Sequence, residues 1–165
     1  MAPQTVTAAT LGAWVFTVNG TRWDSVVEIA RERGSLATRC VAANYRKDVM
    51  AAGQRALLWA SGPASGPRPR GIAGLGWITG PSEIDPENDS DRPSWLARTD
   101  IRLLPDAERV RATDLGEIPG LAHMEILRLP QASNPSWVTR DELALIEPLL
   151  PRWPSMPGRG RSAHG

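Results

Sequence analysis

The sequence has little of several residue types on which whole classes of protein depend. It contains one cysteine, Cys40, which excludes an intrachain disulfide and a zinc site built from several cysteines. Its two histidines, His123 at a predicted strand start and His164 near the C-terminus, do not favour a Cys–His nucleophile or a histidine metal site. No apolar run approaches the roughly 20 residues of a membrane span, and residues 1–20 carry no secretory signal. We therefore expect a soluble, cytoplasmic protein without a metal or cofactor.

Charge and aromatic content narrow the possibilities further. The 19 basic and 18 acidic residues leave a net charge of +1, which excludes a protein held to nucleic acid mainly by bulk charge. Phenylalanine and tyrosine occur once each, whereas tryptophan occurs seven times, and this surplus favours recognition of flat partners by some of the seven. We assign Trp14 and Trp77, which lie inside apolar strands, to the core. Trp95 and Trp137 stay open between core and site.

The chain is long enough for one domain of ordinary size. Residues 1–12 are small and polar and indicate a flexible leader, residues 13–150 form the folded domain, and the Pro-, Gly- and Arg-rich residues 151–165 are predicted to be disordered. Strands are predicted at residues 13–18, 37–41, 55–61, 71–78, 101–104 and 122–127. Capping boxes predict helices that open at Ser25, ending at Gly34, and at Thr139, and a third helix is expected over residues 44–52. This pattern indicates an α+β fold with a small closed or curled sheet.

Two segments resemble ligand-binding loops only superficially. The glycines at positions 71, 74 and 76 lie inside an apolar strand and lack the Gly-Lys-Ser/Thr of a phosphate loop, so they indicate strand curvature or close approach of another strand. Residues 83–91 carry five acidic residues but lack the central glycine and terminal glutamate of a calcium loop, so they indicate a solvated loop.

Basic residues gather in one part of the sequence. Nine of them lie between residues 20 and 70, against four acidic residues, so a local basic face is compatible with the small net charge. Arg39, Arg46 and Lys47 are interleaved with Asn44 and Tyr45. Cations for phosphate beside a ring for stacking are what a nucleic-acid-binding face requires. A solvated helix surface with ordinary salt bridges is the alternative for the remaining basic residues.

Four segments follow one another in a recognisable order. The first is an apolar strand with an early tryptophan at residues 13–18 (AWVFTV), which a helix and then residues 44–50 (NYRKDVM) follow. After them come residues 53–61 (GQRALLWAS) and, beyond a loop, residues 71–78 (GIAGLGWI). In this order and hydrophobic pattern, over about residues 13–149, the chain resembles the EVE domain, a branch of the PUA-like group that also contains the YTH readers of methylated adenine in RNA. Gln54 stands where the family commonly has aspartate, and residues 38–44 (TRCVAAN) lack the family's tryptophan.

The resemblance implies a PUA-like curled β-barrel of about six strands flanked by three helices, with an aromatic-lined pocket for one base flipped out of nucleic acid. It implies a free-standing protein that binds a modified base, and 5-methylcytosine in DNA is the first choice for that base. By family position the base-pocket residues are Asn19, Trp23, Trp59, Ala60, Ser61 and Asn134. The phosphate contacts are assigned to Arg22, Arg39, Arg46, Lys47 and Arg70.

Two other functions stay open. The PUA-like group also includes ASCH domains, some of which resemble amide hydrolases of modified nucleosides with a Lys–Glu–Thr type of site, and Lys47 is the only lysine available for such a site. A domain that binds a small nucleoside-like ligand or a protein partner, without a polymer, fits the same pattern. Our prediction is a non-catalytic module that binds nucleic acid, with DNA preferred to RNA.

Overall fold

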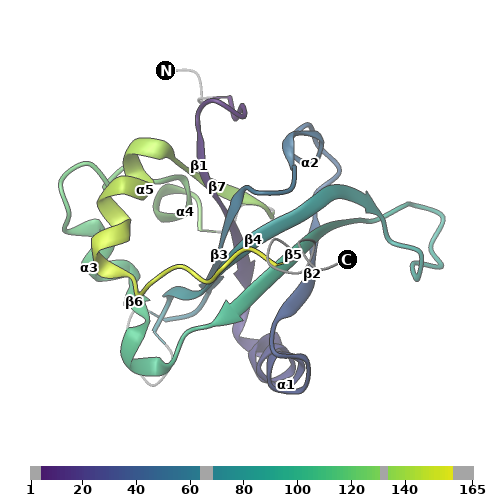
Figure 1. Cartoon of the computed structure of the whole chain (residues 1–165), viewed down its shortest axis with the longest axis horizontal. Coiled ribbons are helices and arrows are strands. Elements are labelled where there is room, and N and C mark those ends of the chain that lie inside the picture. Colours follow the sequence, from purple (N-terminus) through teal and green to yellow (C-terminus); the bar gives the residue numbers. More distant parts are fainter. Residues whose placement is uncertain (1–4, 64–68, 131–133, 158–165) are drawn as a thin grey trace, which may run out of the picture.

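The computed structural model describes residues 5–63, 69–130 and 134–157, which form a mixed α+β fold (Figure 1). The strands are β1 (Leu11–Val18), β2 (Leu36–Val41), β3 (Arg55–Ala60), β4 (Gly71–Ile84), β5 (Trp95–Leu103), β6 (Val110–Arg111) and β7 (Ser136–Thr139). The helices are α1 (Trp23–Arg33), α2 (Arg46–Val49), α3 (Ala112–Gly116), α4 (Glu125–Arg128) and α5 (Arg140–Ile146), with 3-10 turns η1 (Gly20–Arg22), η2 (Asp106–Glu108) and η3 (Glu147–Leu149). The seven strands form one sheet in the order β2-β5-β4-β3-β1-β7, with β6 paired to β4. The expected α+β class is confirmed.

Strand β1 lies in the interior of the sheet, parallel to β3 and antiparallel to β7. Its nearly unbroken apolar sequence suits a strand that is covered on both faces. Trp14 is fully buried, and its indole N–H donates to Oε1 of Gln54 at 2.8 Å, so its assignment to the core is confirmed.

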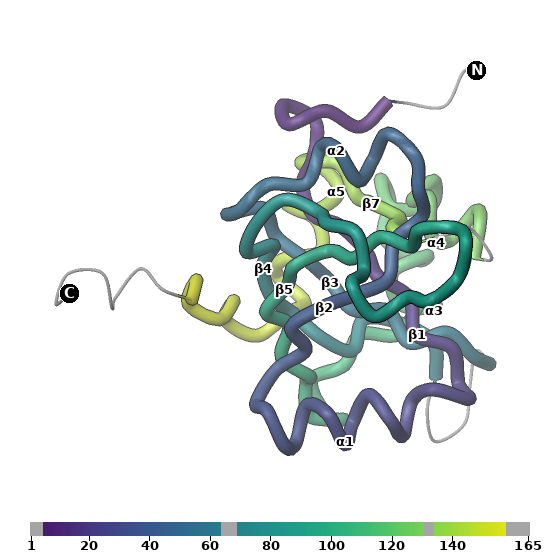
Figure 2. The backbone as a smooth tube through the Cα atoms, turned by 90° about the vertical axis from the view of Figure 1, so that its right-hand side faces the viewer, coloured from purple at the N-terminus to yellow at the C-terminus, as the bar shows by residue number. Residues whose placement is uncertain are grey.

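The two faces of the sheet carry separate hydrophobic clusters because side chains alternate along each strand. Trp14 and Phe16 of β1 pack on the side covered by α1, together with Val26 of that helix. Ala13 and Val15 point to the other side, where residues of α3, α4 and α5 complete the cluster. Figure 1 shows α1 apart from α3, α4 and α5, and Figure 2 shows α1 running below the strands.

The sheet is curled but open, which agrees with the curled sheet that the sequence pattern predicted, whereas a closed barrel is not formed. Its outermost strands in the hydrogen-bonded order are β2 and β7, which do not pair with each other. They approach where Ala42 N–H donates to the carbonyl of Asn134 at 2.8 Å. Glycines in β4 permit close packing of β5: a Cβ on Gly76 would lie 1.9 Å from the carbonyl oxygen of Asp100.

Local signals located two helix boundaries correctly. The capping box of Thr139 and Glu142 is present at the start of α5, and Gly34 ends α1 with a φ of 83°. The predicted capping box at Ser25 is wrong, because α1 begins at Trp23 and no side chain caps it. Instead, the Asn19 side chain accepts from Arg22 N–H and caps the 3-10 turn that precedes the helix.

The predicted strand at residues 122–127 is wrong. Residues 125–128 form the helical turn α4, after a turn in which Met124 N–H donates to the carbonyl of Leu121 at 3.1 Å. The apolar residues of this segment, Met124 and Ile126, are buried in the cluster beneath α5. A short apolar run is compatible with a strand or a buried helical turn, and tertiary packing selected the turn. The predicted helix over residues 44–52 is also shorter, being the one-turn α2.

The folded part extends beyond both expected boundaries of the domain. Val6, predicted to lie in the flexible leader, is 1% exposed. After residue 150 the chain packs against β4: Trp153 donates from its indole N–H to the carbonyl of Gly76 at 2.9 Å, and Trp77 donates to the carbonyl of Pro154 at 2.8 Å. Trp77 is therefore half-buried beneath this segment rather than a core residue. Predicted disorder at residues 158–165 lies outside the described residues.

Candidate functional site

The candidate site lies where the parallel strands β1 and β3 end. Their carboxyl ends are side by side, since Ser61 N–H donates to the carbonyl of Val18 at 2.9 Å. Ligands of α/β sheets commonly bind outside such strand ends. A cavity of about 600 Å³ opens here, between these ends, one face of α1 and strand β2. This volume falls within the range of small-molecule sites.

Five of the eleven predicted site residues line this cavity. They are Asn19, Arg22, Arg39, Ser61 and Asn134. They come from four segments of the sequence: the turn that follows β1, which holds both Asn19 and Arg22, strand β2, the end of β3 and the residue pair before β7. Apolar side chains also line the cavity, namely those of Val18, Val26, Ile29 and Leu96.

Asn134 builds one wall of the cavity and extends the edge of β1 where its pairing with β7 stops. The Asn134 amide oxygen accepts from Thr17 N–H at 2.7 Å and from the Thr17 hydroxyl at 3.0 Å, and its amide N–H donates to the Thr17 carbonyl at 3.2 Å. Its side chain thus takes the place of a strand partner. Because the same residue also accepts from Ala42, it joins three segments and determines the shape of this wall.

The cationic side of the cavity consists of Arg22 and Arg39. One guanidinium N–H of Arg39 donates to the carbonyl of Thr17 at 3.4 Å, while its buried Nε has no hydrogen-bond partner. Burial lowers the pKa of Arg39; Cys40 opposes this effect, and the charge of Arg22 lowers the pKa further. Within the described part of the chain no carboxylate forms an ion pair with either arginine.

Two predicted pocket residues line a smaller neighbouring hollow. Trp23 and Ala60 border a hollow of about 80 Å³ that shares Val18 and Ser61 with the larger cavity. The Trp23 indole also contacts Arg109, whose guanidinium lies 5.0 Å from the ring centroid. Trp23 is therefore beside the candidate site and does not line it.

Trp59 does not lie in the cavity. It is 2% exposed and packs among Ile72, Leu75 and the helices of the opposite face. A base cannot stack on it in this structure, so its assignment to an aromatic pocket wall is wrong. Trp137, left open by the sequence, is also a core residue at 5% exposure.

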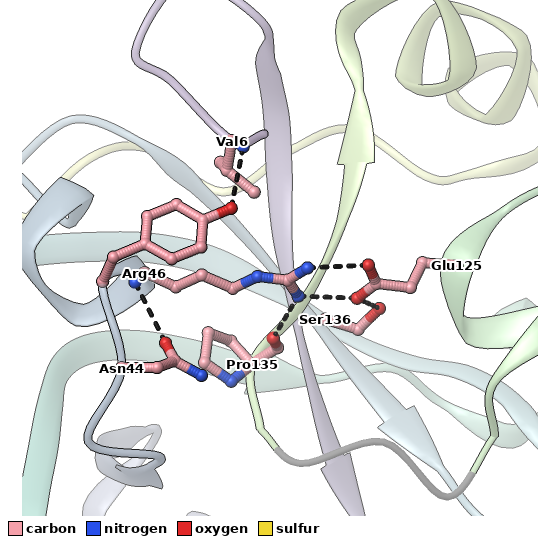
Figure 3. Close-up of polar contacts among 7 residues, drawn as sticks. Val6, Asn44, Arg46, Glu125, Pro135 and Ser136 are labelled. Carbon is pink, nitrogen blue, oxygen red and sulfur yellow. Dashed lines mark hydrogen bonds and ion pairs between the residues drawn. The ribbon is translucent and has the colours of Figure 1, made fainter. Parts of the chain in front are cut away.

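Arg46 is engaged inside the protein and does not face a phosphate (Figure 3). Its guanidinium donates to both carboxylate oxygens of Glu125 at 2.6 and 2.8 Å and to the carbonyl of Pro135 at 3.0 Å. The hydrogen bond to Glu125 raises the pKa of Arg46, and burial opposes it. Burial would raise the pKa of Glu125, but Arg46, with smaller contributions from Ser136 and Arg128, lowers it below its ordinary value.

Two further predicted phosphate contacts also lie outside the cavity. Lys47 places its ammonium group 3.9 Å from the centroid of the Trp95 ring and 2.7 Å from Asp48, and only 15% of its side chain is exposed. This contact gives the half-buried Trp95, the other tryptophan left open, a structural role. Arg70 lies beside β6, where its Nε is buried without a partner.

Several cavity residues were missed at the level of sequence. Thr17, Thr38 and Cys40 all line the cavity, and each is a small residue with a polar or thiol group within strand β1 or β2. No motif marks them. Cys40 is exposed and adjacent in sequence to Arg39, so the only thiol of the chain lies at the site.

A second cavity, of about 470 Å³, lies between the start of β3 and α5. Its charged residues already have partners: Arg55 forms an ion pair with Glu147, and Arg140 donates to the carbonyl of Ala8 at 3.1 Å. Among the described residues no group of three or more His, Cys, Asp or Glu side chains is placed to hold a metal ion. In the same residues no helix has the length and apolar character to cross a membrane.

Comparison with known proteins supports the fold but does not assign a function to the chain. No family model and no curated protein matches the chain. A crystal structure of a Pseudomonas putida protein is similar over 83% of this chain and 98% of its own, with a TM-score of 0.61 and 21% identity. A hypothetical protein from Leishmania major is similar over 84% and 94%, with a TM-score of 0.62 and 16% identity. A Rhodopseudomonas palustris protein solved by NMR is similar over 84% and 92%, with a TM-score of 0.60 and 19% identity.

Proposed function

We propose that this protein is a non-catalytic nucleic-acid-binding module that takes one modified base, 5-methylcytosine in DNA, into the cavity at the ends of β1 and β3. The proposal includes the PUA-like architecture of the EVE domain that the sequence resembles. The observation that carries it is convergence: five residues from four segments of the sequence, each predicted to contact nucleic acid, line one cavity.

The chemistry of the cavity suits a base. A flipped base loses its stacking and pairing, which costs a few kcal/mol, and the pocket has to offset this with stacking and hydrogen bonds to the base edge. Asn19 and Ser61 supply side-chain donors and acceptors for the edge, and Val26 with Ile29 supplies an apolar surface. Since Trp59 is in the core, the apolar surface of Val26 and Ile29 has to supply the contact with the face of the base that an aromatic wall would have supplied.

The position of Lys47, the only lysine of the chain, does not support the alternative of a hydrolase. A Lys–Glu–Thr type of site needs Lys47 at the substrate, but this side chain is packed on Trp95 and paired with Asp48, outside the cavity. A domain for a small nucleoside-like ligand would use the same cavity, so binding measurements have to separate it from the reader.

The test is a panel of labelled oligonucleotides at two salt concentrations. It contains duplex DNA and single-stranded RNA, each with 5-methylcytosine or plain cytosine at one position. We expect the methylated DNA to bind about tenfold more tightly than the plain duplex, because one methyl group in an apolar pocket contributes about 1–3 kcal/mol. Arg39→Gln should weaken binding.

The matched control is Arg31→Gln, which removes the same charge from an exposed position in α1 that does not line the cavity. It should leave the preference for the methylated duplex intact. Equal affinity for every oligonucleotide at both salt concentrations, or equal loss in both variants, would rule out the reader.

A further inference from the structure

Unlike three other arginines of the described residues, the two arginines of the cavity have no carboxylate partner. Arg46 is paired with Glu125, Arg55 with Glu147 and Arg98 with Glu83. Arg22 and Arg39, in contrast, line one cavity with no such partner among the described residues. Two cations that share a cavity repel each other: burial lowers the pKa of Arg39, and the charge of Arg22 lowers this pKa further.

The hydrogen bonding of Arg39 is incomplete. A guanidinium group has five N–H donors, and buried donors are almost always satisfied. The side chain of Arg39 makes one hydrogen bond to protein, at the long distance of 3.4 Å, and its Nε is buried without a partner. The terminal N–H groups of Arg39 that the Thr17 carbonyl does not engage are left for a ligand, and an oxyanion that accepted from them and from Arg22 would neutralise the two charges together.

We infer that the cavity takes a nucleotide together with its phosphate group, and that Arg39 and Arg22 hold this phosphate. The inference rests on the proposed function and specifies the smallest ligand that the site recognises: a nucleoside monophosphate unit, not a bare base or nucleoside. The neutral wall of Asn19, Ser61 and Asn134 and the apolar residues of α1 then face the base and sugar. Planar bidentate donors make arginine well suited to phosphate.

The lone thiol of the chain offers a direct measure of occupancy. Cys40 is exposed, lines the cavity and follows Arg39 in the sequence. A ligand that occupies the cavity should therefore slow alkylation of Cys40 by neutral iodoacetamide. The probes are 5-methyldeoxycytidine, its 5′-monophosphate and inorganic phosphate, at constant ionic strength, and the readout is the concentration of each probe that halves the alkylation rate.

We expect the monophosphate to protect Cys40 at a concentration at least about tenfold lower than the nucleoside, as a charge-assisted hydrogen-bond pair would produce. Arg39→Gln should abolish this difference, and Arg22→Gln should reduce it and serves as a second variant at an exposed position if Arg39→Gln does not fold. Arg31→Gln should retain it. Comparing probes within each variant removes any effect of the substitution on the thiol itself.

Three results would overturn the inference. One is equal protection by nucleoside and monophosphate, which includes no protection by either. Another is a preference for the monophosphate that survives both substitutions. The third is protection by inorganic phosphate as strong as that by the monophosphate, which would assign the site to free anions. Failure of the reader is distinguished from these, because the oligonucleotide panel would then show no preference for the methylated duplex while the monophosphate still protects Cys40.

Discussion

Arg46 and Glu125 form a bidentate ion pair although 79 residues separate them in the sequence (Figure 3). Both side chains are largely buried, with 16% and 12% of their surface exposed. The pair links α2 to α4, and through Pro135 and Ser136 it holds the segment that carries Asn134 to the cavity wall. A residue predicted to contact phosphate is thus part of the framework that positions the site.

We expect the Arg46→Ala and Glu125→Ala variants each to lower the free energy of unfolding by about 3–5 kcal/mol, because either leaves a buried charge without its partner. Urea denaturation measures the effect. The double variant Arg46→Met/Glu125→Met should lose less than the sum of the two single changes. Additive losses would contradict a direct interaction between the two side chains.

The same pair should make stability depend on pH. The pKa of Glu125 is lowered in the folded protein, so the folded state favours the ionised carboxylate. The stabilisation is therefore fully present above the unfolded pKa and is lost as pH falls through the folded pKa. We expect the difference in free energy of unfolding between wild type and Glu125→Gln to be constant from pH 7 to about pH 5 and to shrink at lower pH. A difference that grows on acidification would have the wrong sign for this linkage.

Trp59→Ala should lower the free energy of unfolding and leave the preference for the methylated duplex unchanged in the protein that remains folded. Removal of a large buried side chain leaves a cavity and costs about 3–5 kcal/mol. The near-UV circular dichroism and thermal midpoint report this loss. Trp23→Ala is the matched comparison, because Trp23 borders the small hollow next to the site and is only partly buried. It should destabilise the protein less and reduce the preference for the methylated duplex; the reverse order of stabilities would contradict both placements.

Salt dependence should separate the cavity arginines from Lys47. Each phosphate contact on duplex DNA contributes about −0.9 to the slope of log affinity against log salt concentration. We expect Arg22→Gln to flatten the slope by about one unit. Lys47→Ala should leave the slope unchanged, because the ammonium group of Lys47 contacts Trp95 and Asp48. The sequence-based assignment of Lys47 to a phosphate contact is therefore wrong. Filter-binding titrations across a series of salt concentrations measure both; a flattened slope in Lys47→Ala alone would invert the two roles.

The sequence by itself determined the features that depend on neighbouring residues. The apolar run of β1 predicted a strand buried on both faces, the Thr139–Glu142 pair predicted the start of α5, and Gly34 predicted the end of α1. Each depends on backbone hydrogen bonds or burial within a few residues. The cavity residues Asn19, Ser61 and Asn134 came from family position, and the structure brings these three together.

Tertiary structure alone decided which side chains of those elements are available to a ligand. Trp59 and Leu58 are neighbours in a strand covered on both faces, so no local pattern showed which hydrophobic cluster either would join, or that neither would face a ligand. Arg46 forms an ion pair with Glu125, and Lys47 packs on the ring of Trp95. Both partners lie far away in the sequence, and these contacts keep the two cations from binding a phosphate. Charges and rings can be counted in a sequence, but their pairing follows from the folded arrangement, because an ion pair or a ring contact forms only where the fold brings its two partners within a few ångströms.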